Sequence, residues 1–233
     1  MKFRLLLTTL VLMLGVFFAA CASDSVANNA ISNTANKTTN NVESKDLATN
    51  TTNNTTTNTG PTLGAPAPTF SLEDQDSKKI SLSDFAGKVV VLEWTNPDCP
   101  FVKRHYEAKT MTTTANKYKD KDVVWLAINT THYMAKDKYK EWIKTHNLSY
   151  PILDDHEGTV GRMYGAKTTP HMFIIGKDGK LVYQGSVDDD NNGDKGKTAI
   201  NYIDQALAEL TVGKPVSVAT TRPYGCSVKY AQK

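Results

Sequence analysis

The sequence predicts one α/β domain with a central mixed sheet flanked by helices and an extended C-terminal tail. Short, wholly apolar runs alternate with amphipathic segments between residues 89 and 210, which is typical of strands covered by helices. Residues 61–233 are numerous enough for one domain with its own core. Residues 213–233 contain Pro215 and Pro223, which favours an extended final segment.

The first half of this domain reads as strand, helix, strand, helix. Residues 89–92 and 123–128 are continuous apolar runs, as expected for strands buried on both faces. The sequence predicts one helix over residues 100–118. It predicts a second helix over residues 136–146, where aromatic and aliphatic side chains recur at core-like spacing.

The second half reads as a short helix, a hairpin and a final helix. The short helix is expected over residues 159–164. Segments 171–175 and 180–184 are rich in β-prone residues and flank a turn that contains Asp-Gly, which predicts a β-hairpin. Apolar side chains at three- and four-residue steps over residues 199–210 predict an amphipathic helix. This order of elements is the thioredoxin-like arrangement.

The N-terminus has the features of an export signal. Lys2 and Arg4 precede an apolar core that ends at Phe18 and is short for a transmembrane helix. We expect residues 1–20 to be removed. The sequence Phe-Ala-Ala-Cys ending at Cys21 resembles a bacterial lipoprotein box, which predicts lipid attachment to Cys21; secretion by cleavage elsewhere is the alternative.

We expect residues 21–60 to be the lipidated cysteine followed by a disordered tether. Residues 22–60 contain ten asparagines, ten threonines and no aromatic residue, so they cannot bury enough apolar surface to offset the entropy of ordering. The sequence therefore predicts a domain over residues 61–233, anchored to a membrane of the bacterial cell envelope and facing away from the cytoplasm.

Composition excludes several classes of function. The net charge is +3 and no basic block is interleaved with aromatic residues, so nucleic acid is not an expected partner. The five histidines show no paired metal-ligand spacing, and we expect neither a metal nor a cofactor. The Asp- and Asn-rich segment 188–194 lacks the glutamate that closes an EF-hand loop and predicts a solvated loop.

Cys99 is the leading candidate for a reactive group. It stands between a predicted strand and a predicted helix, and the positive end of a helix dipole stabilises a thiolate. Pro100 suits the first turn of a helix, and Lys103 and Arg104 add positive charge. The alternative is a buried, inert cysteine.

Several segments resemble one family. Residues 64–70 resemble the entry segment of redoxins, the branch of the thioredoxin-like superfamily that includes the peroxiredoxins of AhpC/TSA type. Residues 82–88 resemble the family's lead into its first core strand, and residues 96–102 and 224–230 are also similar to redoxin motifs. The resemblance covers nearly all of the predicted domain. It implies a thiol-dependent oxidoreductase in which Cys99 attacks a peroxide or a protein disulfide.

The resemblance also implies a substrate site. Thr169 and Pro170 correspond to the family's cis-proline loop, which lies against the reactive cysteine and offers backbone groups to an extended substrate. Asn96 and Pro100 are expected to contribute to the same site. His171 is a candidate base, although a histidine that begins a buried strand is more often structural.

The chain departs from two family patterns. Val102 stands where thioredoxins have their second cysteine, so a disulfide cannot form within that turn. Peroxiredoxins have a threonine three residues before the attacking cysteine, where this chain has Asn96. Peroxide and protein disulfide therefore both stay open as substrates.

Cys226 is the candidate partner that resolves oxidised Cys99. No other thiol remains once Cys21 carries lipid, and Gly225 would let the tail turn tightly before the sulfur. The alternative is a packed tail in which Cys226 is an ordinary small apolar residue. An external thiol is the expected electron donor.

Two functions compete with the enzyme. A non-catalytic module would keep the fold and hold extended peptides in the cis-proline groove. A metallochaperone is the weaker alternative, because two cysteines far apart in sequence make a sparse site for a soft metal.

Overall fold

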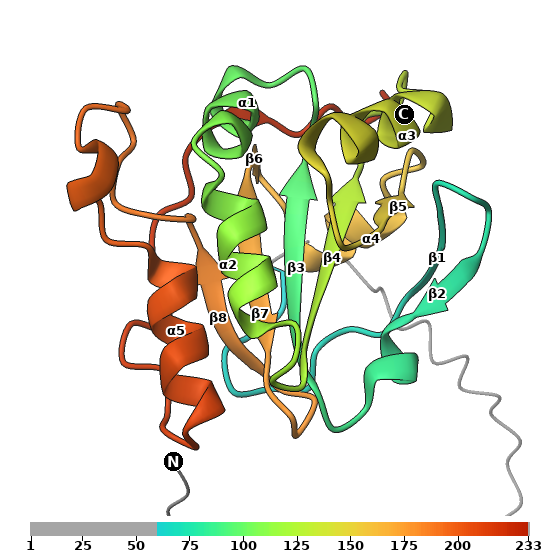
Figure 1. Cartoon of the computed structure of the whole chain (residues 1–233). Helices are drawn as coiled ribbons and strands as arrows, with labels where there is room; N and C mark the ends of the chain where they lie inside the picture. Colours follow the sequence, from blue (N-terminus) through green and yellow to red (C-terminus); the bar gives the residue numbers. More distant parts are fainter. Residues whose placement is uncertain (1–59, 233) are drawn as a thin grey trace, which may run out of the picture. The chain divides into compact units, whose positions relative to one another are not determined.

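A seven-stranded mixed sheet forms the centre of the computed structural model, which describes residues 60–232 (Figure 1). Its order is β2-β1-β5-β4-β3-β7-β8. The strands are β1 (Ser71–Asp74), β2 (Lys79–Ser81), β3 (Val89–Thr95), β4 (Val123–Asn129), β5 (Ile152–Asp154), β7 (His171–Ile175) and β8 (Leu181–Gly185). β3 pairs in parallel with β4 and antiparallel with β7, as the predicted mixed sheet requires.

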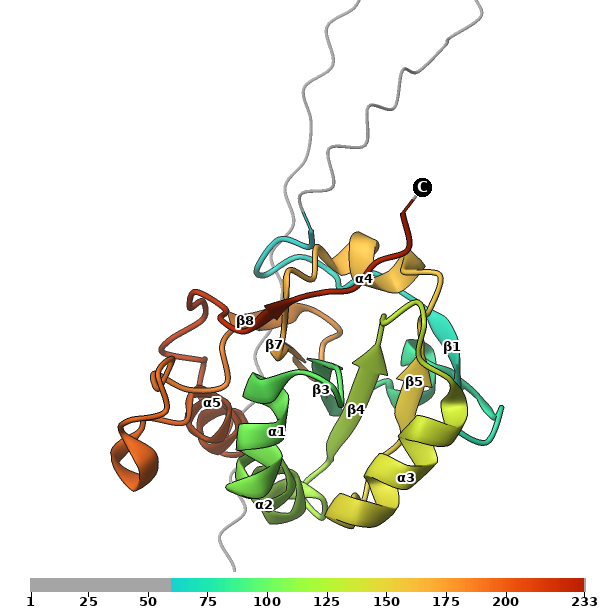
Figure 2. The same ribbon diagram turned by 90° about the horizontal axis from the view of Figure 1, so that it is seen from above.

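Helices cover both faces of this sheet. They are α1 (Pro100–Glu107), α2 (Thr110–Tyr118), α3 (Lys136–His146), α4 (Thr159–Tyr164) and α5 (Tyr202–Thr211), with short 3₁₀ turns η1 (Leu82–Phe85) and η2 (Gly196–Thr198). Figure 2 shows α1, α2, α3 and α5 on one side and α4 on the other. Among the described residues, none of the helices is both long and apolar enough to cross a membrane.

The central strand β3 separates two apolar clusters. Val89 and Val91 pack on the side of α1, α2, α3 and α5, whereas Val90, Leu92 and Trp94 pack on the side of α4. This alternation follows from the two-residue period of a strand. All seven residues of β3 are buried, so the strand gives a firm base for the turn that follows it.

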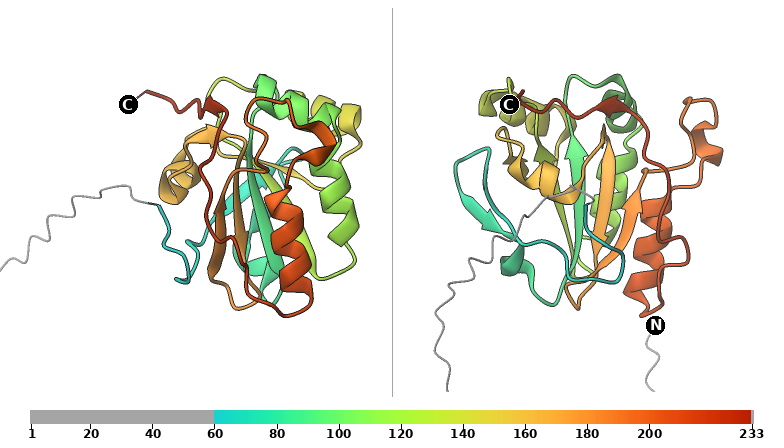
Figure 3. Two further views of the ribbon diagram at one scale, coloured as in Figure 1. Left: turned by 90° about the vertical axis from the view of Figure 1, so that its left-hand side faces the viewer. Right: turned by 180° about the vertical axis from the view of Figure 1, so that it is seen from behind.

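The C-terminal tail folds back across the domain. Figure 3 shows it running beside β8 to the end of the sheet where α1 begins. The amide of Thr221 donates to the carbonyl of Gln184 at 3.1 Å. Further on, β9 (Cys226–Ser227) pairs antiparallel with β6 (Thr168–Thr169). The predicted extended tail is thus packed against the domain.

Two predicted helices differ from those observed. The single helix expected over residues 100–118 is broken, because Lys109 adopts a left-handed conformation with φ of 58° and ends the first helix. The final helix begins at Tyr202 rather than at residue 199. The side chain of Asn201 caps it by accepting the amides of Ile203 and Asp204, while Ile200 is exposed.

The prediction of a solvated loop over residues 188–194 was wrong for two of its carboxylates. Asp188 and Asp190 are each only 6 % exposed. Asp190 accepts the backbone amides of Gly193, Asp194 and Gly196, so this carboxylate organises the loop from within. The expected signal, Cys21 and all but the last residue of the tether lie outside the described residues.

Candidate functional site

Cys99 caps the N-terminus of α1, as its position between strand and helix predicted. It has extended backbone angles and is followed by Pro100 in the first turn. The Cys99 amide donates to the carbonyl of Asn96 at 2.9 Å, and the Asn96 side chain accepts the amide of Asp98 at 2.9 Å. Asn96 therefore shapes the turn that presents the thiol.

The cis-proline loop lies against this thiol. The Thr169–Pro170 bond is cis, as the resemblance implied. The Cys99 sulfur is 3.0 Å from the carbonyl oxygen of Thr169, although the two residues are far apart in the sequence. Of the predicted site residues, Cys99, Thr169 and Pro170 thus meet at one end of the sheet.

The tail brings Cys226 to the same place. Within the β6–β9 pair, Cys226 lies opposite Thr169. Gly225 precedes it with φ of +131°, a conformation that favours glycine, and a Cβ there would collide with the carbonyl of Thr169. The tail therefore runs as a strand across the groove beside Pro170.

The two sulfurs are in contact. Sγ of Cys99 is 2.7 Å from Sγ of Cys226, and both cysteines are free thiols. A disulfide bond measures about 2.05 Å, so only a small displacement separates the dithiol from a bridge. The structure thus has the proximity that a resolving cysteine requires.

The two thiols differ in acidity. Burial raises the pKa of Cys99, but hydrogen bonding with Cys226, with Thr169 and with the Val102 amide lowers it more, so the pKa lies below its ordinary value. Burial and then the hydrogen bond to Cys99 raise the pKa of Cys226 to about 11. Cys99 therefore ionises first, and Cys226 is the donor that stabilises its thiolate.

The two cations expected to activate Cys99 have other surroundings. Lys103 is exposed and neither it nor Arg104 is among the groups that lower the pKa of Cys99. Arg104 instead donates to the backbone carbonyl of Asp190 at 2.6 Å. The hydrogen bonds at the sulfur, rather than these charges, favour the anion.

His171 has the surroundings of a structural residue. It is 5 % exposed, and its Nδ1 accepts the amide of Lys167 at 3.2 Å. Burial, together with the charge of Lys167, lowers its pKa to about 3. The ring is therefore neutral near pH 7, and this favours the structural interpretation over the role of a base.

Glu93 is a buried carboxyl group that the sequence reasoning overlooked. It lies in β3 with no exposed surface and accepts hydrogen bonds from Tyr106 and Trp125, each at 2.9 Å. Burial raises its pKa to about 7, although these hydrogen bonds act in the opposite direction. An acidic residue inside an apolar strand was the signal that could have found it.

Comparison with solved structures gives the same fold. A hypothetical protein from Sinorhizobium meliloti aligns with a TM-score of 0.67 and 25 % identity over 74 % of this chain and 96 % of its own. An uncharacterised protein from Geobacillus kaustophilus aligns with a TM-score of 0.66 and 30 % identity over 74 % and 94 %. The peroxidoxin BcpB of Mycobacterium tuberculosis, at a TM-score of 0.51 and 23 % identity over 66 % and 99 %, shares the fold. The predicted thioredoxin-like fold is confirmed.

Comparison of sequences identifies the family. A thiol-disulfide oxidoreductase ResA from Bacillus thuringiensis is 32 % identical over 122 residues, covering 52 % of this chain and 68 % of the relative. The model of the AhpC/TSA family matches residues 63–184, more than half of the chain; Cys99, Thr169 and Pro170 lie inside this range and Cys226 lies beyond it. The chain therefore belongs to the AhpC/TSA family and is a thiol-based oxidoreductase.

Proposed function

We propose that the protein is a thiol–disulfide oxidoreductase that cycles between a dithiol and a disulfide of Cys99 and Cys226. The observation that carries this proposal is the 2.7 Å separation of their sulfur atoms. A two-cysteine cycle needs a second thiol that reaches the first one without external help. Val102 cannot supply it from α1, whereas Cys226 is already in contact.

The cycle begins with the Cys99 thiolate, which attacks one sulfur of a substrate disulfide. That bond breaks, a mixed disulfide forms, and the first substrate thiol leaves with a proton. Cys226 then loses its proton and attacks the sulfur of Cys99, which releases the second substrate thiol. The substrate gains two electrons and two protons, and the protein is left with a Cys99–Cys226 disulfide.

An external thiol donor closes the cycle by attacking Cys226. Cys226 is partly exposed and Cys99 is buried, so the donor has better access to Cys226. A thiol of lower pKa is also the better leaving group, and Cys99 is the more acidic of the two. Two donor thiols are oxidised to a disulfide for each turnover.

The relatives support disulfide exchange as the reaction. The relative from Bacillus thuringiensis is named a thiol-disulfide oxidoreductase, and its similarity extends over 122 residues. Protein disulfides are therefore the first substrate class to test. Asn96 also supports this choice, because it stands where peroxiredoxins have a threonine.

A peroxidase is the second candidate, and the burial of Cys99 favours it. Cys99 is 2 % exposed beneath the tail, so a small oxidant reaches it more easily than a folded protein does. Its thiolate would attack one peroxide oxygen, break the O–O bond and release water after protonation. Cys226 would then attack the resulting sulfenic acid and release a second water as the disulfide forms.

One comparison of rates separates these functions. The reduced protein is mixed with hydrogen peroxide and, separately, with a protein disulfide, and the loss of the Cys99 thiol is followed in both. A faster reaction with the protein disulfide supports our first choice, and a faster reaction with peroxide supports the second. If Cys99 alkylation leaves extended-peptide binding intact and neither oxidant reacts, the protein is a binding module.

We also propose that this chemistry takes place at the bacterial cell envelope, with a lipid on Cys21. The proposal rests on the apolar segment before Cys21 and on the Asn- and Thr-rich residues behind it. Cys21→Ala should abolish incorporation of labelled palmitate in growing cells. Equal labelling of the parent and the variant would overturn the anchor.

A further inference from the structure

Cys226 lies between two anchored parts of the tail. On its N-terminal side, the hydroxyl of Thr221 bonds to Tyr183 at 2.7 Å and accepts the amide of Ser186 at 2.8 Å. On its C-terminal side, the amide of Val228 donates to the carbonyl of Lys167 at 3.1 Å. The tail is therefore held at both ends of the segment that carries the sulfur.

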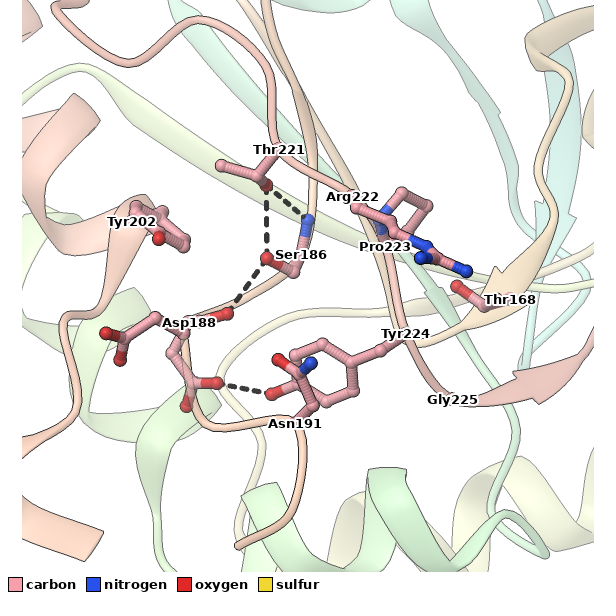
Figure 4. A pocket seen from close by; sticks show the side chains of 11 residues that line it. Thr168, Ser186, Asp188, Asn191, Tyr202, Thr221, Arg222, Pro223, Tyr224 and Gly225 are labelled. Carbon is pink, nitrogen blue, oxygen red and sulfur yellow. Dashed lines mark hydrogen bonds between the residues drawn. The ribbon is translucent and has the colours of Figure 1, made fainter. Parts of the chain in front are cut away.

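Tyr224, two residues before Cys226, joins this part of the tail to a charged side chain and to α1. Its hydroxyl donates to the buried carboxylate of Asp188 and lies 3.0 Å from Nε2 of His105 and 3.4 Å from a guanidinium nitrogen of Arg104. Figure 4 shows the Tyr224 hydroxyl pointing to the carboxylate of Asp188. Both residues line a cleft of about 620 Å³. One hydroxyl group thus joins the tail to two other elements.

The partners of Tyr224 include the helix that carries Cys99. His105 and Arg104 belong to α1, and the ring of Tyr224 also packs edge-on against Phe101 with centroids 6.0 Å apart. Cys99 caps the same helix. Tyr224 therefore ties the Cys226 segment to the element that positions the other sulfur.

The charges around this hydroxyl suit a neutral tyrosine. Burial is the main cause that raises the pKa of Tyr224, so the group stays protonated and donates to Asp188. Burial lowers the pKa of His105, which leaves a neutral ring able to donate from Nε2 to the Tyr224 oxygen. A hydrogen bond to a charged partner is stronger than one between neutral groups.

We propose that Tyr224 is a positioning residue that holds the sulfur of Cys226 against that of Cys99. The inference rests on the proposed two-cysteine cycle. Fixing one thiol beside another raises its effective concentration and so favours the intramolecular disulfide. The contact also keeps the tail over Cys99, so its release exposes the attacking sulfur to a large substrate.

Tyr224→Phe tests this proposal because it keeps the ring and removes the hydroxyl. The full chain is equilibrated with mixtures of reduced and oxidised glutathione, and the Cys99–Cys226 disulfide is quantified by mass spectrometry after acid trapping. We expect the equilibrium constant for disulfide formation to fall about tenfold, as for loss of one hydrogen bond to a charged group. Alkylation of Cys99 in the reduced protein should become faster.

Tyr202→Phe is the matched control. Tyr202 lines the same cleft but lies in α5 rather than in the tail, so its loss of a hydroxyl should leave the equilibrium constant unchanged. Asp188→Asn keeps an oxygen that can accept the hydrogen bond from Tyr224, so its equilibrium constant should lie between those of the parent and Tyr224→Phe. Urea midpoints of all variants, measured in the reduced state, separate loosening of the tail from loss of the fold.

The outcomes distinguish the two proposals. If the parent forms no Cys99–Cys226 disulfide at any glutathione ratio, the two-cysteine cycle is wrong. If the parent forms it and Tyr224→Phe gives the same equilibrium constant, the cycle stands and the positioning role is wrong. An equal loss in Tyr202→Phe would also overturn the role, because the effect would then belong to the cleft as a whole.

Discussion

The turn that carries Cys99 and the tail that carries Cys226 are held in different ways. Cys99 follows β3, which is buried along its whole length and paired on both sides. Cys226 lies in a two-residue strand that is paired only with β6. The first sulfur is buried in a turn that directly follows the central strand. The second sulfur is partly exposed, on a segment that packs against the surface of the domain.

This difference suits a relay between two sulfurs. The attacking thiol needs constant surroundings, because its acidity depends on the hydrogen bonds it receives. The partner thiol has to approach after the attack and withdraw before the next one. A surface segment held by a two-residue strand pair and a few further contacts opens at a lower free energy than a core strand does.

The largest effect is expected from replacing the two cysteines in turn. Cys99→Ser should lower the turnover rate by at least about a thousandfold, because a neutral hydroxyl is a much poorer nucleophile than a thiolate. Cys226→Ser should also stop turnover but leave the first attack intact, so that a mixed disulfide between Cys99 and the substrate accumulates. Mass spectrometry of the trapped protein distinguishes the two blocks. If both variants gave the same trapped products, the two cysteines would not have the different roles of attacking and resolving thiol.

In the core, the buried carboxyl group of Glu93 should make the stability of the protein depend on pH. Glu93 has a folded pKa of about 7 against an ordinary value of 4.5, so the folded state binds its proton more tightly than the unfolded state does. Its contribution to the free energy of unfolding is therefore fully present below pH 4.5. About 3 kcal/mol of that contribution is lost as the pH rises from 4.5 to 7. Glu93→Gln should remove this loss.

The measurement is urea unfolding at several pH values, taken as the difference between the parent and Glu93→Gln. The difference is needed because His171 acts with the opposite sign. Its folded pKa of about 3 lies below the ordinary 6.5, so its contribution grows as the pH rises between those values. If the free energies of unfolding of the parent and the variant change in parallel from pH 4.5 to 7, Glu93 does not titrate in this range.

Sequence reasoning succeeded where one local pattern decides the structure. The apolar run beginning at Val89 and the hairpin that follows Pro170 predicted β3 and β7–β8, and the motif around Cys99 placed the thiol at a helix N-terminus. It failed at Lys109, where neither glycine nor proline marks the break between α1 and α2. A left-handed lysine depends on packing that no short window of sequence contains.

The approach of Cys226 to Cys99 was a hypothesis that the sequence left open. A cysteine 127 residues away along the chain gives no information on distance, because the path of the tail depends on its pairing with β6. Tyr224 and Asp188 were missed for the same reason. An acidic loop looks solvated until a distant tyrosine is found against it, so only the tertiary structure joins the two.

On the tail side, Gly225→Ala should weaken the disulfide without disturbing the core. Its φ of +131° and the nearby Thr169 carbonyl leave no room for a Cβ, so the β6–β9 pair has to separate. We expect about a tenfold fall in the equilibrium constant with glutathione, from strain of 1 kcal/mol or more. Gly213→Ala is the control, because that glycine also has a positive φ but no atom near its Cβ position. Equal effects at both positions would mean that backbone strain alone, rather than the contact with Thr169, matters.

The smallest effect concerns the influence of the tail on the pKa of Cys99. Cys226 is the foremost of the hydrogen-bond partners that lower the pKa of Cys99, so Cys226→Ala should raise that pKa. Its rate of alkylation, followed against pH, would then reach its plateau at a higher pH than in the parent. Cys226→Ser is the sharper companion, since its hydroxyl still donates to the sulfur and should preserve part of the shift. If neither variant moves the profile, Cys99 owes its acidity to the turn and to the N-terminus of α1 alone. The tail would then act only as a resolving segment, and the two regions would be electrostatically independent.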